Sequence, residues 1–218
     1  MRLPGTEKPI PAFRHLILTL ILLAAGSSAF AGAEEDYQQG LAAYRATDVV
    51  GAMTPLKRAA DAGHARAQAL YGTILDSAEL DEAAVTYLRK SADQSDPEGQ
   101  YALAKMYMTG EGIAINNSEA NRLIRAAAAQ GHDRAIITLA LAYIGRDAKL
   151  GADASTAPEA AGFILKAAEL GDVSAMEALA RAYRVGEFGI QPDAAKANEW
   201  AEKLAKIRGT NRKKSDRR

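Results

Sequence analysis

The feature of this sequence that most constrains its fold is an internal repeat. When the chain is aligned with itself on Gly63, Ser95, Gly131 and Gly171, neighbouring units are separated by 32, 36 and 40 residues. A period of this size is typical of stacked supersecondary units that bury their apolar faces against one another. Six further positions hold similar residues in every unit, including a small residue three places before the anchor, at Ala60, Ala92, Ala128 and Ala168.

The spacing of the repeated positions predicts two helices joined by a tight turn in each unit. Similar residues recur at separations of three, four and eight places, which lie on one face of an α-helix. The anchor glycine suits a left-handed residue at the end of the first helix, and the His or Asp that follows suits an N-cap of the second. Twelve places after the anchor we expect a bulky side chain between neighbouring pairs, such as Tyr107, Tyr143 and Tyr183.

We therefore predict an all-α protein, a helix-turn-helix solenoid of about four repeats with helical caps. The solenoid is expected to span residues 32–207. A segment at 37–45 is predicted to cover its first repeat, and a terminal helix over 192–207 is predicted to close it, with Trp200 as a lid. The repeats are predicted over residues 48–80, 81–116, 117–156 and 157–191.

Composition supports a helical fold and removes several kinds of site. Hydrophobic residues make up 48% of the 218 residues but aromatic residues only 6%, which favours closely packed helices over a β-sandwich. The chain has no cysteine, so it has no disulfide, zinc–thiolate site, cysteine nucleophile or iron–sulfur cluster. Lys plus Arg and Asp plus Glu both number 27, which argues against a uniformly basic nucleic-acid binder.

Both ends of the chain differ from the repeats. An apolar run at 16–25 follows basic residues, and Ala29 and Ala31 occupy the two positions that a signal peptidase requires. We expect a signal peptide over 1–31, cleaved after Ala31, and hence a periplasmic or secreted protein without a stable membrane span; a retained anchor is the alternative. Residues 208–218 hold six basic residues and one acidic residue, and we expect a disordered tail there, solvated or in contact with an anionic surface.

No residue pattern points to catalysis, a metal or a cofactor. His64 and His132 occupy the same repeat position two units apart, so we expect them to cap helices rather than to converge on a metal ion. The glycine-rich segments at 110–112 and 186–189 lack the strand and the Lys-Ser/Thr pair of a phosphate loop, and no nucleophile motif is present. The sequence therefore predicts a non-enzymatic protein.

The chain resembles Sel-one-like repeats of the bacterial secreted type, relatives of the tetratricopeptide repeat. The resemblance covers residues 36 to about 207 and is carried by LKRAADAGHARAQ (56–68), LRKSADQSDPEGQYALAKMYMTGEGI (88–113) and IRAAAAQGHDRAIITLALAY (124–143). It implies a right-handed α/α superhelix that serves as a protein-interaction scaffold. Periplasmic members include signalling regulators and proteins that support exopolysaccharide assembly. Some secreted members are rich in cysteine and bind β-lactams, but this chain has no cysteine.

Basic side chains align on the first helices, which line the concave face in such relatives. Helix dipoles alone favour cations at these places, and the other interpretation is a groove for an acidic peptide or polysaccharide. We expect a protein partner and no nucleic acid, for a periplasmic adaptor or regulator; an acidic glycan, for a scaffold in exopolysaccharide assembly, is the alternative. The aligned cations are Lys57, Arg58, Arg89, Lys90, Arg125 and Lys166.

Overall fold

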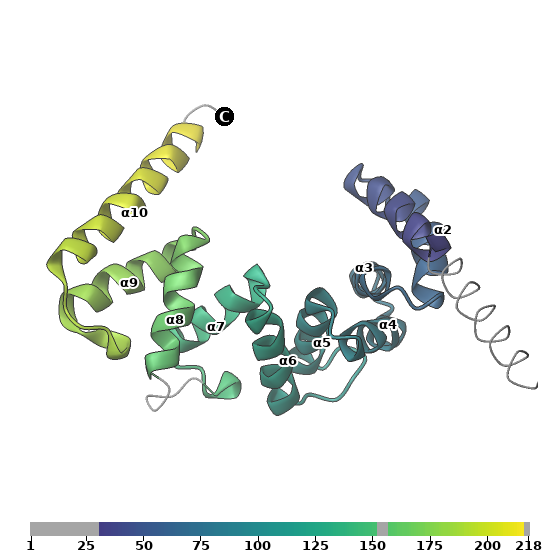
Figure 1. Ribbon diagram of the computed structural model, residues 1–218, viewed down its shortest axis with the longest axis horizontal. Coiled ribbons are helices and arrows are strands. Elements are labelled where there is room, and N and C mark those ends of the chain that lie inside the picture. Colours follow the sequence, from purple (N-terminus) through teal and green to yellow (C-terminus); the bar gives the residue numbers. More distant parts are fainter. Residues whose placement is uncertain (1–30, 152–156, 216–218) are drawn as a thin grey trace, which may run out of the picture.

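The computed structural model describes residues 31–151 and 157–215 and shows helix pairs stacked in an arc whose two ends rise toward the same side (Figure 1). A leading helix occupies residues 31–45, and α10 (Ala194–Ser215) is the last helix. The described ranges contain no strand, so the predicted all-α solenoid is confirmed. Between the end helices lie four pairs, α2 (Val49–Asp61) with α3 (Ala65–Ser77), α4 (Asp81–Asp93) with α5 (Pro97–Thr109), α6 (Asn117–Ala129) with α7 (Asp133–Gly145), and α8 (Ala157–Glu169) with α9 (Val173–Val185).

Short 3₁₀ turns follow the last two pairs, η1 (Ala148–Leu150) after α7 and η3 (Glu187–Gly189) after α9.

The turn inside each pair follows from two consecutive residues. The anchor residues adopt left-handed backbone conformations, with φ of 91° at Gly63, 63° at Ser95, 82° at Gly131 and 92° at Gly171. This conformation ends the first helix and costs least at glycine. The next side chain accepts a hydrogen bond from the backbone N–H three residues later, which confirms the predicted N-caps at His64, Asp96, His132 and Asp172.

Small residues receive leucine side chains where neighbouring pairs pack together. A Cβ added to Gly40 would lie 2.5 Å from Leu56 Cγ, and one added to Gly72 would lie 2.8 Å from Leu88 Cδ2. The leading helix therefore packs onto α2 as α3 packs onto α4, in the manner of a second helix. The other repeat positions singled out from the sequence are buried at Ala60, Ala92, Ala128, Ala168, Tyr107, Tyr143 and Trp200 and half-buried at Tyr183.

The second helices of neighbouring pairs also contact one another directly. Such contacts join α3 to α5 and α7 to α9, whereas contacts between the first helices of neighbouring pairs are weaker. Each junction is thus formed mainly by the second helix of one pair against the first helix of the next, and the second helices add direct contacts between α3 and α5 and between α7 and α9.

The basic C-terminal segment differs from the prediction. The terminal helix was expected over 192–207 with a disordered tail over 208–218, but α10 continues to Ser215. Lys and Arg are good helix formers, and extending an existing helix avoids the cost of nucleation. The predicted signal peptide lies outside the described residues except for Ala31. Among the described helices, none has the length and apolar character to cross a bilayer.

Candidate partner-binding cleft

A cleft of about 440 Å³ runs along the second helices at the N-terminal half of the molecule. It takes residues from the leading helix, from α3, and from the starts of α5 and α7. The leading helix and the first three helix pairs thus contribute to one concave surface. Its lining consists of Tyr37, Leu41, Tyr44, Arg66, Ala69, Leu70, Thr73, Asp96, Pro97, Glu98, His132 and Arg134.

One wall of the cleft is aromatic and aliphatic. Tyr37, Leu41 and Tyr44 follow one face of the leading helix, and Leu70 of α3 lines the same cleft. Tyr44 keeps 38% of its surface exposed, so part of its ring is accessible to a ligand. This wall can bind an apolar side chain.

The other wall is a polar network centred on Glu98 of α5. His132 Nδ1 accepts the Ala135 N–H at 3.2 Å, so the ring proton lies on Nε2, which faces Glu98 Oε2 at 2.9 Å. Arg134 donates to the other oxygen, Glu98 Oε1. The Arg134 guanidinium also lies over the Tyr101 ring, with 5.1 Å from Cζ to the ring centroid. Every charge in this network has a partner.

A second copy of this arrangement joins the leading helix to α3. His64 Nδ1 accepts the Ala67 N–H at 3.1 Å, and His64 Nε2 lies 2.8 Å from Glu34 Oε2. The Tyr37 ring stacks on the imidazole with 4.5 Å between centroids. Arg66 stands two places after His64, as Arg134 stands two places after His132. In contrast to Arg134, Arg66 makes no hydrogen bond or ion pair with a residue that the structure describes.

The network strongly favours the ionised form of Glu98. The hydrogen bond from His132 and the adjacent Arg134 guanidinium outweigh burial and lower the pKa of Glu98 from 4.5 to about 2. In the first copy, hydrogen bonds from Gln38 and His64 likewise lower the pKa of Glu34.

Acidification should therefore weaken the junction between α5 and α7. Because the pKa of Glu98 is lower in the folded than in the unfolded chain, its ionisation stabilises the fold above about pH 4.5, and this contribution is lost as the pH falls toward 2. Carboxyl ¹³C shifts recorded during an acid titration should place the Glu98 midpoint near 2. The Glu98→Gln variant should lose this part of the pH dependence, and a native midpoint near 4.5 would contradict the network.

The predicted basic series does not line this cleft. Lys57 pairs with Asp61, Arg58 with Asp36, and Arg125 with Glu159. Lys90 lies over the Tyr87 ring at 5.2 Å, and Arg89 and Lys166 are exposed on α4 and α8. The six cations lie on first helices, and carboxylates of this chain already pair with three of them.

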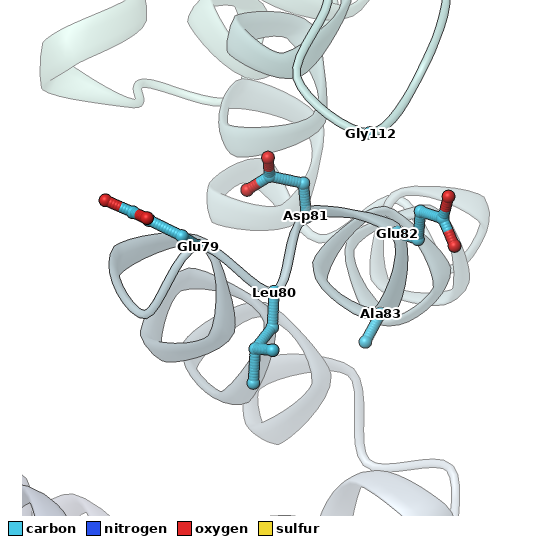
Figure 2. Close-up of a pocket in the computed structure, with 6 residues that line it drawn as sticks. All are labelled: Glu79, Leu80, Asp81, Glu82, Ala83 and Gly112. Atoms are coloured by element: carbon cyan, nitrogen blue, oxygen red, sulfur yellow. The ribbon is translucent and has the colours of Figure 1, made fainter.

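A second hollow lies between α4 and the loop that contains Gly112 (Figure 2). Three carboxylates surround it, from Glu79, Asp81 and Glu82, but Figure 2 shows that they point apart. A Cβ on Gly112 would lie 2.5 Å from the Asp81 carbonyl carbon, so the loop needs glycine for its close approach. No group of three His, Cys, Asp or Glu side chains suited to a metal ion occurs in the described parts of the chain.

Sequence comparison finds the Sel1 repeat in this chain at residues 66–96, 97–132 and 173–206. The chain carries three Sel1 repeats. The Sel1 match at 66–96 runs from α3 across the turn into α4 and ends at Asp96, the N-cap of α5. A comparison with curated protein sequences finds no match.

Solved structures of Sel1 repeat proteins share the fold. The structure of c5321, a protective antigen of uropathogenic Escherichia coli strains displaying an SLR fold, matches with a TM-score of 0.67 and 27% identity. The match covers 83% of this chain and 40% of c5321. A Sel1 repeat protein from Oxalobacter formigenes matches with a TM-score of 0.65 and 26% identity, over 80% of this chain and 73% of that one. This chain therefore spans less than half the length of c5321.

Proposed function

We propose that this protein is an exported, non-enzymatic scaffold that binds a segment of a partner protein in the cleft. In the periplasm it acts as an adaptor or regulator. The observation that supports this best is the cleft itself, in which the leading helix and three helix pairs combine an aromatic and aliphatic wall with charged side chains. Sel1 repeats are typically protein-interaction scaffolds, which agrees with this role.

Export is supported by the sequence that precedes the described helices. The basic start, the apolar run at 16–25 and Ala29 and Ala31 form the pattern of a cleaved secretory signal. Cleavage after Ala31 leaves Glu34, Glu35 and Asp36 in the first turns of the leading helix, where acidic residues are favoured by the helix dipole.

The experiment compares two leucines on second helices. Leu70 lines the cleft on α3, and Leu141 is 41% exposed on α7 outside it. The full-length protein is expressed in its own cells, cross-linked, and purified from the envelope fraction, and the partner is identified and then titrated against each variant. We expect Leu70→Ser to weaken the complex by about tenfold, because a desolvated apolar anchor is lost, and Leu141→Ser to leave it unchanged.

Equal binding by the two variants would show that the partner contacts another surface. Recovery of the protein only from the cytoplasmic fraction, with residues 1–31 still attached, would contradict export.

A further inference from the structure

We infer that the cleft takes an acidic segment of the partner, whose carboxylate pairs with Arg66 while a neighbouring apolar side chain packs on the tyrosine wall. This inference rests on the proposed function and adds the chemistry of the bound segment.

Two arginines and two carboxylates line the cleft, and three of these four groups already bind a group of this chain. Asp96 caps α5 through the Gly99 N–H, and Glu98 is bound by His132 and Arg134. Arg66 is exposed and lines the cleft, yet it makes no hydrogen bond or ion pair with any described residue. Its charge acts on Glu34 and Tyr37 only through space. Arg66 is thus the guanidinium of the cleft that is open to a ligand.

The difference between the two copies of the network explains why Arg66 is open. In the second copy, Glu98 Oε1 receives Arg134, and the residue four places later on α5 is Ala102. In the first copy, the residue four places after Glu34 is Gln38, and its Nε2 donates to Glu34 Oε1 at 2.7 Å. Gln38 therefore occupies the oxygen that Arg66 would otherwise bind.

The surroundings of Arg66 indicate a protein segment as the occupant. A guanidinium binds a carboxylate through two parallel hydrogen bonds, which fixes orientation as well as charge. Leu41, Tyr44 and Leu70 line the same cleft and suit an aliphatic or aromatic side chain beside that carboxylate. A uronic-acid glycan would satisfy Arg66 but would leave Leu41 and Leu70 without an apolar partner.

The experiment uses matched peptides and the full-length protein. The probes are short fluorescent peptides in which one Glu is set among Leu, Phe and Ser residues, each paired with a peptide that carries Gln instead. We expect native protein to bind the Glu peptides about tenfold more tightly than their Gln partners, because a charge-assisted pair is added. Arg66→Gln should remove this preference, and Arg89→Gln, which changes an exposed arginine on α4 outside the cleft, should retain it.

Two further variants test the competition for Glu34 and Glu98. Gln38→Ala makes the first copy resemble the second, so Glu34 should capture Arg66 and the preference for Glu peptides should fall. Ala102→Gln should act in the opposite direction by releasing Arg134 and strengthening the binding of acidic peptides. Gln38 and Ala102 do not line the cleft, so neither effect would arise from a lost ligand contact.

The outcomes separate this inference from the proposed function. If peptides bind but the Glu and Gln partners bind equally, or if Gln38→Ala changes nothing, the role of Arg66 is wrong and the cleft still binds protein. If no peptide binds and oligogalacturonate does, the occupant is a glycan and both proposals fail. Thermal unfolding by circular dichroism confirms that each variant is folded before it is titrated.

Discussion

Replacing Leu88 with alanine should lower the free energy of unfolding by about 2–5 kcal/mol. Leu88 is fully buried on α4, and its side chain fills the space above Gly72 of α3. Alanine would leave a cavity at the junction of the first two pairs, and glycine opposite cannot fill it. Because each pair packs mainly on its neighbours, this junction connects the leading helix, α2 and α3 to the rest of the molecule.

Urea unfolding followed by circular dichroism measures the loss. Leu141→Ala provides the control, since Leu141 is 41% exposed on α7 and its truncation should change stability by no more than about 0.5 kcal/mol. Similar unfolding midpoints for the two variants would mean that the leucine–glycine contact does not hold the units together.

A double-mutant cycle at Ser91 and Gly99 should show strong coupling. Ser91 is buried and donates a hydrogen bond to the Ala65 carbonyl at 2.9 Å, and a Cβ on Gly99 would lie 2.2 Å from Ser91 Oγ. We expect Gly99→Ala to cost about 1–3 kcal/mol through overpacking and Ser91→Ala to cost about 0.5–1.5 kcal/mol through the lost hydrogen bond.

The Ser91→Ala/Gly99→Ala double variant should lose less unfolding free energy than the two single variants lose together. The reason is that it recreates a pair of residues that the other units already use. At the same two positions those units carry alanine twice, as Ala59 with Ala67, Ala127 with Ala135, and Ala167 with Ala175. Chemical denaturation of the four proteins gives the interaction energy, and simple additivity would show that the two positions are independent.

The sequence predicted the architecture because the repeat encodes local geometry. The anchor at Gly131, for example, ends α6, and His132 after it caps α7, and both effects depend on residues only a few places apart. The contact between Gly72 and Leu88 has the same local origin, because a residue without a side chain lets the neighbouring helix approach closely. Such features follow from backbone preferences that a single repeat displays.

The cleft depends on contacts between units and was not predicted. The sequence left the basic series open to a helix-dipole role or a ligand groove, and the structure pairs Arg58 with Asp36, 22 residues away, and Arg125 with Glu159, 34 residues away. Charge pairing over such distances depends on how the pairs are rotated against each other, which the repeat pattern does not state. The resemblance placed the ligand surface on first helices, whereas the cleft lies along second helices.

One signal for the cleft was nevertheless present in the sequence. Glu34 and Tyr37, like Glu98 and Tyr101, are three places apart, and each pair is followed in the next second helix by His and, two places later, Arg. A comparison of this pattern between the two copies would have identified both networks. It would also have shown that Gln38 in the first copy stands where the second copy has Ala102.

The connection of each unit mainly to its neighbours has a mechanical consequence. A stack of this kind bends and twists easily as a whole, because small rotations at successive junctions add up along its length. The cleft draws its lining from Tyr37 to Arg134, so a segment that spans it would connect the leading helix and three helix pairs to one another. The N-terminal half would stiffen at a fixed curvature, while the half from α8 to α10 would keep its compliance. Binding of a ligand in the cleft would thus change the elasticity of the whole molecule.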